Sequence, residues 1–153
     1  MVNPNNDFVP CMLIPLQKRY LILPNSLIAE VLPMPSLVDT RQPNDFLLGQ
    51  YPWQTQSIPI LDIETLIDKR PTAHQHAKKL CVLYSITEHS LEAYAIPCYG
   101  ALQLIHLSPN AIDISQEVAE VTDYIHCHVF IGNQIAIIPN LDNIEKIITN
   151  NSQ

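Results

Sequence analysis

The sequence has few glycines and few basic residues, and both shortages exclude classes of function. It contains only three glycines in 153 residues, Gly49, Gly100 and Gly132, which lie too far apart to form a phosphate-cradling loop. Eight Lys and Arg residues stand against 15 Asp and Glu, which gives a formal net charge of −7. Because nucleic-acid binding needs clustered cations to neutralise phosphates, we expect no nucleic-acid partner.

Long apolar segments are also missing. No apolar run approaches the roughly 20 residues of a membrane-spanning helix, and Met1 to Asp7 lacks the basic and apolar regions of an export signal. We therefore expect a cytoplasmic protein with no direct membrane insertion. In that reducing compartment, scattered cysteines without a Cys-x-x-Cys pair are expected to be unpaired core residues: Cys11, Cys81, Cys98 and Cys127.

What the sequence does contain indicates a packed all-β protein. Hydrophobic residues make up 47% of the chain and charged residues 15%, a balance typical of one folded domain. The apolar segments are short and rich in Ile, Val, Leu and Tyr, and thirteen prolines and polar clusters separate them, as is typical of strands. Predicted strands span residues 9–16, 20–23, 47–53, 57–61, 79–86, 91–97, 101–106, 124–131 and 134–138.

Three turns can be read between these strands. Gly132-Asn133 supplies two residues able to adopt positive φ between apolar runs, which predicts a tight hairpin over residues 129–138. The hairpins near residues 17–18 and 54–55 lack glycine, so we expect longer or less regular turns there.

Two short helices are predicted, at residues 62–67 and 141–148. Each lies at the end of a longer segment, and the two segments resemble each other. Each helix begins near an Asp whose carboxylate can cap free N–H groups. The first segment reads IPILDIE from Ile58 to Glu64, and the second reads IPNLDNIE from Ile138 to Glu145, with Asn143 as an insertion. This match predicts a duplication: two half-chain units of about five strands, which form small barrels because closure removes exposed edges. Residues 68–77 are expected to connect the halves.

At this point the sequence resembles a known family. The run LLGQYPWQTQSIPILDI from Leu47 to Ile63 resembles the signature of CheW-like domains. Residues 20–33 are similar to that family's second strand and the turn after it, with Glu30 at the acidic position, and residues 124–148 to its last hairpin and closing helix. The resemblance implies a single CheW-like domain over residues 8–149, built of two intertwined five-stranded β-barrel subdomains with short helices, with flexible termini at 1–7 and 150–153.

One departure from the family lies in the signature turn. The family's Asn-Leu-Arg-Gly tetrad is Pro52-Trp53-Gln54-Thr55 here, so a neutral amide replaces the charged fork of arginine and its charge-assisted bonds. A tryptophan ahead of this turn resembles the ChpC-type adaptors of chemosensory systems that govern type IV pili and twitching motility.

The resemblance implies a function without catalysis. Such adaptors couple the cytoplasmic tip of a chemoreceptor to the regulatory domain of a CheA-type histidine kinase, and they use no cofactor. The alternative is a β-barrel that binds a small ligand or a metal. No residue spacing in the chain indicates a catalytic Cys and His pair.

The family resemblance places residues 28–32 and 46–56 on one face of the first barrel, as a protein-binding surface. Trp53 is either an interface anchor or a lid over the barrel core, and Phe46 and Tyr51 extend an aromatic patch if Trp53 is exposed. Glu30, in a short turn, either contacts a partner or is simply solvated. The predicted protein-binding residues are Ile28, Glu30, Leu32, Phe46, Tyr51, Trp53 and Gln54.

Two histidines have a spacing that metal sites use. His126 and His128 lie on one face of a strand by its period of two, while Cys127 points to the opposite face. A metal site would need a further ligand, such as His106. We interpret the pair as ordinary strand histidines and expect no metal.

Overall fold

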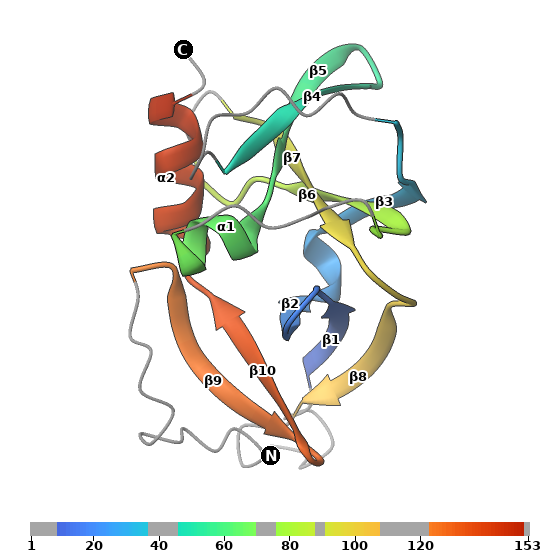
Figure 1. Ribbon diagram of the computed structural model, residues 1–153, viewed down its shortest axis with the longest axis vertical. Coiled ribbons are helices and arrows are strands. Elements are labelled where there is room, and N and C mark those ends of the chain that lie inside the picture. The colour runs from blue at the N-terminus through green and yellow to red at the C-terminus, as the bar shows by residue number, and fades with distance from the viewer. Residues whose placement is uncertain (1–8, 37–45, 70–75, 88–90, 108–122, 152–153) are drawn as a thin grey trace, which may run out of the picture.

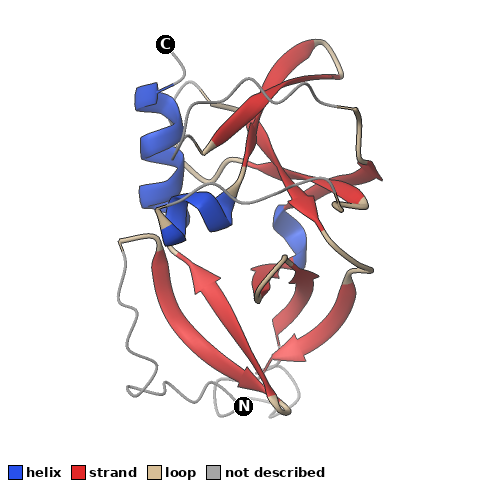
Figure 2. Cartoon of the chain, viewed as in Figure 1, coloured by secondary structure: helices blue, strands red, loops and turns tan. Residues whose placement is uncertain are grey.

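The computed structural model describes residues 9–36, 46–69, 76–87, 91–107 and 123–151. Within these ranges the chain forms ten strands, two α-helices and one short 3-10 helix, η2 (Figure 1, Figure 2). Their order is β1 (Val9–Pro15), β2 (Tyr20–Pro24), η2 (Asn25–Leu27), β3 (Ile28–Pro33), β4 (Leu47–Trp53), β5 (Gln56–Leu61), α1 (Ile63–Asp68), β6 (Lys79–Tyr84), β7 (Ala93–Cys98), β8 (Gln103–Leu107), β9 (Ile125–Ile131), β10 (Gln134–Pro139) and α2 (Leu141–Asn151).

The strands form two five-stranded sheets. Sheet I has the order β8-β1-β2-β10-β9 and sheet II the order β3-β6-β7-β5-β4, and Figure 1 shows sheet II above sheet I. Each sheet takes strands from both halves of the chain, so the two subdomains are intertwined, as the family resemblance implied. In these hydrogen-bonded ladders, β8 and β9 are the end strands of sheet I, and β3 and β4 those of sheet II.

The two sheets repeat one topology, which supports the predicted duplication. In sheet I, β10 is antiparallel to β9 and parallel to β2; in sheet II, β5 is antiparallel to β4 and parallel to β7. The remaining pairs, β1 with β2 and β8, and β6 with β7 and β3, are all antiparallel. Each half contributes five strands and ends in a strand followed by a helix.

One local prediction was wrong, and another was right only in part. Residues 28–32 form strand β3 rather than a turn, because their β-branched and aliphatic side chains pair with β6. The turn at residues 54–55 is not longer, because Trp53 pairs directly with Gln56. It is less regular, since Gln54 takes a left-handed φ of 54° without being glycine. The hairpin at Gly132, with φ of 59°, is confirmed.

The helices begin where polar caps are available. Asp62 Oδ1 accepts the Thr65 N–H at 3.1 Å at the start of α1, as predicted. At the start of α2 it is Asn140 whose side chain accepts a backbone N–H, that of Asn143, at 3.2 Å, while Asp142 lies in the first turn. Most of the predicted connector at residues 68–77 lies outside the described residues. Among the described residues, none of the helices has the length and apolarity needed to cross a membrane.

Three hydrophobic clusters hold the fold together. The largest lies between the sheets and includes Ile14 and Leu21 of sheet I, Tyr94 and Ile96 of sheet II, and apolar residues of both helices. A second cluster belongs to sheet II and a third to sheet I. Each sheet therefore has a small core of its own, and the shared cluster joins the two sheets.

Candidate functional site

Trp53 joins the two end strands of sheet II. Its ring is 6% exposed and packs in the core of that sheet, and its indole Nε1–H donates to Glu30 Oε2 at 2.9 Å. The ring also meets Tyr84 edge-on, with centroids 6.4 Å apart. Trp53 is therefore a buried core residue rather than an exposed interface anchor. Its hydrogen bond to Glu30 links β4 to β3, the two end strands of sheet II.

The other predicted protein-binding residues divide between two cores. Leu32 and Tyr51 are half-buried against the same cluster as Trp53, whereas Ile28 and Phe46 pack against the cluster between the sheets. Only Glu30 and Gln54 are exposed. The premise of an exposed aromatic patch thus fails. Among the other residues of 28–32 and 46–56, Val31 is 39% exposed, and Gln50, Pro52 and Thr55 are exposed as well.

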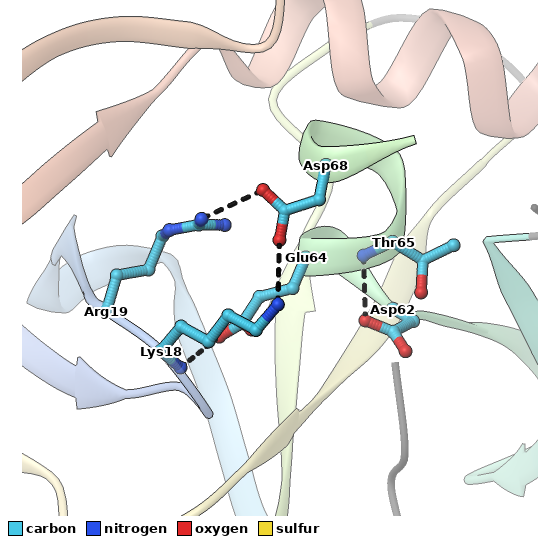
Figure 3. Close-up of polar contacts among 6 residues, drawn as sticks. All are labelled: Lys18, Arg19, Asp62, Glu64, Thr65 and Asp68. Carbon is cyan, nitrogen blue, oxygen red and sulfur yellow. Dashed lines mark hydrogen bonds and ion pairs between the residues drawn. The ribbon is translucent and has the colours of Figure 1, made fainter. Parts of the chain in front are cut away.

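A buried polar cluster that sequence reasoning missed lies at the junction of the sheets (Figure 3). Glu64, on α1, is 3% exposed, and its Oε1 accepts the Lys18 N–H from the β1–β2 turn at 3.0 Å. Arg19 Nη2 donates to Asp68 Oδ1 at 2.9 Å, and Lys18 Nζ lies 3.8 Å from Asp68 Oδ2. These contacts tie the helix that follows sheet II to a hairpin of sheet I.

Burial governs the charge state of Glu64. Burial raises the pKa of its carboxyl, and the Lys18 N–H and the Arg19 guanidinium lower it in part. Glu64 Oε2 and Arg19 Nη1 are buried without a hydrogen-bond partner. The buried polar atoms of this junction are therefore only partly hydrogen-bonded.

Glu145 makes the matching junction on the other side and is fully buried. Its carboxylate accepts the backbone N–H groups of Ile86 and Thr87 at 3.0–3.1 Å, and the hydroxyls of Ser85, Thr87 and Tyr94 at 2.6–3.0 Å. Burial and the Glu145 carboxylate raise the pKa of Tyr94 far above its ordinary value, so the phenol stays a donor. The aligned glutamates of the internal repeat were the sequence signal for this pair.

The cysteines and histidines lie where ordinary strand residues lie. Cys11, Cys81 and Cys98 are buried, and the neighbouring Cys81 thiol together with burial raises the pKa of Cys98. His126 is exposed and Cys127 packs inward, on opposite faces of β9 as predicted. Among the described residues, no group of three or more His, Cys, Asp or Glu side chains is placed to hold a metal ion.

Comparison with known proteins finds the same architecture elsewhere. The structure is similar to the crystal structure of the scaffolding protein TtCheW from Thermoanaerobacter tengcongensis, with a TM-score of 0.67 over 88% of this chain and 85% of that one, at 14% sequence identity. No curated protein matches the sequence. The sequence model of the CheW-like domain matches residues 10–147, nearly the whole chain. The chain therefore belongs to the CheW-like domain family.

Proposed function

We propose that the protein is a non-enzymatic cytoplasmic adaptor that couples the cytoplasmic tip of a chemoreceptor to the regulatory domain of a CheA-type histidine kinase. The observation that carries this proposal is the CheW-like domain over residues 10–147. The likeness in fold to a scaffolding protein supports it. Glu64, Glu145 and Trp53 each make an internal hydrogen bond, and side chains fixed before binding suit a docking platform.

The docking surface that we propose consists of the predicted residues, of which two contact the partner and five position those two. Glu30 is exposed and held by the indole of Trp53 at 2.9 Å, so its carboxylate is oriented before a partner arrives. Gln54 is exposed at the tip of the β4–β5 turn. Leu32, Tyr51 and Trp53 support the two from the core, and Ile28 and Phe46 set the position of β3 and β4 against the rest of the molecule.

We further propose that the pathway controls type IV pili and twitching motility. The support is the tryptophan ahead of the signature turn, which resembles the ChpC-type adaptors. Deleting the gene in its native host is expected to abolish twitching, and re-expressing the protein is expected to restore it. Normal twitching in the deletion strain would remove this part of the proposal and leave the adaptor function standing.

Binding measurements with purified components test the adaptor function. The protein is titrated with the receptor's cytoplasmic helical hairpin and with the kinase regulatory domain from the same host. Glu30→Lys, which reverses an oriented exposed charge, is expected to weaken at least one complex about tenfold or more. Asp142→Lys, the same charge reversal at an exposed position in the first turn of α2 and in neither β3 nor β4, is the control and is expected to bind as wild type does.

Two outcomes would count against the proposal in different ways. If the wild-type protein binds neither component, the adaptor function is wrong. If it binds both and folded Glu30→Lys binds both equally well, the adaptor function stands and the docking surface lies elsewhere. Stoichiometric metal in the purified protein would instead favour the alternative of a metal-binding β-barrel.

A further inference from the structure

A groove opens in sheet I where the pairing of β2 with β10 stops. These parallel strands pair only at Ala136 with Tyr20 and at Ile137 with Leu21, although β10 pairs with β9 already from Gln134 onward. The groove has a volume of about 710 Å³. Its described lining comes from the β1–β2 turn, the segment after β7 and the β9–β10 hairpin: Pro15, Leu16, Gln17, Lys18, Arg19, Tyr20, Tyr99, His128, Asn133, Gln134, Ile135 and Ile137.

The groove is basic in an acidic chain. Its described lining includes Lys18, Arg19 and His128 and no Asp or Glu, although the chain carries a formal charge of −7. Asp68, at the end of α1, is not part of the lining and forms an ion pair with Arg19, with 2.9 Å between Asp68 Oδ1 and Arg19 Nη2. Lys18 Nζ is 3.8 Å from the same carboxylate, and the Lys18 side chain is 53% exposed, so its ammonium group remains accessible to an anion from outside.

An apolar strip continues from the groove along the β9–β10 hairpin. The register sets Ile135 opposite Phe130 and Ile137 opposite His128, so these four side chains lie on one face of the hairpin. Ile135 is 39% exposed and Phe130 38% exposed. The exposed strip therefore begins among the groove residues, at Ile135 beside the buried Ile137, and extends to Phe130.

We propose that this groove docks an acidic, amphipathic segment of a partner protein, whose apolar side chains cover Ile135 and Phe130 while a carboxylate meets Lys18. The volume alone would also suit a small organic molecule. The strip, however, reaches past the groove to Phe130, and a peptide segment can cover both where a small molecule fills only the groove. None of the lining residues belongs to the docking surface proposed around Glu30 and Trp53, so the inference does not rest on that surface.

Selection from a random-peptide display library tests the inference without knowledge of the partner. Peptides enriched on the wild-type protein are expected to combine acidic and large apolar residues, and their binding, measured by fluorescence anisotropy, is expected to weaken with salt. Lys18→Gln and Ile135→Ser are each expected to weaken binding about tenfold. Lys79→Gln and Leu104→Ser make the same changes at exposed positions outside the groove, and both are expected to bind as wild type does.

Three results would overturn the inference. The first is enrichment of peptides without acidic residues. The second is unchanged binding to the groove variants, each confirmed to be folded by its thermal unfolding curve; Phe130→Ser replaces Ile135→Ser if the latter does not fold. The third is that no peptide is enriched while a free aromatic acid, tested as 4-hydroxyphenylacetate, binds in a manner that depends on Lys18 and Ile135, which would make the groove a small-molecule site.

Discussion

Glu64 and Glu145 occupy equivalent positions in the two halves of the chain, and each carboxylate binds the hairpin of its own half that lies in the opposite sheet. Glu64 follows β5 of sheet II and binds the β1–β2 turn of sheet I. Glu145 follows β10 of sheet I and binds Ser85 and Thr87, which follow β6 of sheet II, and Tyr94 of β7. The repeat thus connects the two sheets at two places. Glu145 accepts hydrogen bonds on both of its carboxylate oxygens, whereas Glu64 Oε2 has no partner.

Replacing Glu145 by Gln is expected to lower the free energy of unfolding by about 2–4 kcal/mol. The carboxylate is fully buried and accepts hydrogen bonds from five donors. A glutamine amide would turn an NH₂ group toward some of those donors and leave buried polar groups without partners. Urea unfolding followed by circular dichroism measures the change.

The matched control is Glu92→Gln. Glu92 is exposed, and within the described structure its carboxylate accepts one hydrogen bond, from Gln56, so its replacement should change stability by less than about 0.5 kcal/mol. Equal small effects at Glu145 and Glu92 would show that the buried network does not fasten the sheets.

Glu64 is expected to make stability fall as pH rises. Its native pKa is raised by burial, so the native state binds the proton more readily than the unfolded chain does. The stabilisation from this group is complete below the unfolded-state pKa and is lost as pH rises through the native pKa. The difference in unfolding free energy between wild type and Glu64→Gln should therefore favour wild type most in acid and decline toward neutral pH.

Urea titrations of both proteins at several pH values check this. The charged groups that act on Glu64 are Arg19, which opposes the shift, and Asp62, which adds to it, and both remain in the variant. Asp123→Asn, which removes an exposed acid, serves as the control. A wild-type advantage that grows with pH would contradict the prediction.

Much of the fold could be predicted from strand patterning, and the exceptions have physical causes. β4 was predicted with its observed bounds, and β1, β5 and β10 to within one residue at each end, because apolar runs between turn residues set them. Strand β3 was missed because its apolar residues are interrupted by Glu30 and its pairing partner, β6, lies about fifty residues away in sequence. Pairing at that distance leaves no local signal.

The candidate site was harder to predict for a similar reason. The residues around Trp53 were identified from the signature of the CheW-like family. Whether Trp53 is buried depends on β3 and β4 being the two end strands of one sheet, and the pattern of apolar residues does not predict which strands share a sheet. Glu64 and Glu145 were visible as aligned acids in the repeat, yet an acid in a short helix is ordinarily exposed. Only their hydrogen-bond donors, placed by the opposite sheet, show that they are buried.

Trp53→Ala is expected to destabilise the protein by about 3–5 kcal/mol, because the ring is 6% exposed and truncation leaves a cavity in the core of sheet II. Trp53→Phe keeps most of the ring and removes the donor to Glu30. Glu30 is exposed, so water can replace that bond, and the cost should be nearer 1 kcal/mol.

A double-mutant cycle with Glu30→Gln separates packing from the hydrogen bond. The coupling between Trp53→Phe and Glu30→Gln should be about 0.5–1 kcal/mol. Because Trp53 is the only tryptophan in the chain, its fluorescence also reports on this contact. Trp53→Ala with wild-type stability would mean that the ring is not part of the core.

Gln54→Gly and Thr55→Gly, neighbouring substitutions in one turn, are expected to change stability in opposite directions. Gln54 takes a φ of 54°, a left-handed conformation that costs a residue with a Cβ roughly 1–2 kcal/mol. Glycine removes that cost but gives the unfolded chain more freedom, worth about 0.5–1 kcal/mol, so Gln54→Gly should raise the free energy of unfolding by up to about 1.5 kcal/mol.

Thr55 has no such strain, since Gln54 and Lys69 are the only non-glycine residues with positive φ in the described structure. Thr55→Gly therefore relieves no strain and only increases the conformational entropy of the unfolded chain. It should lower the free energy of unfolding by about 0.5–1 kcal/mol. The comparison is sharp because the resembling signature carries its glycine at the position of Thr55, whereas the left-handed residue here is Gln54. Denaturant unfolding of both variants against wild type decides it, and a stabilising Thr55→Gly with a destabilising Gln54→Gly would show that the turn has the family's glycine-type conformation at residue 55 instead.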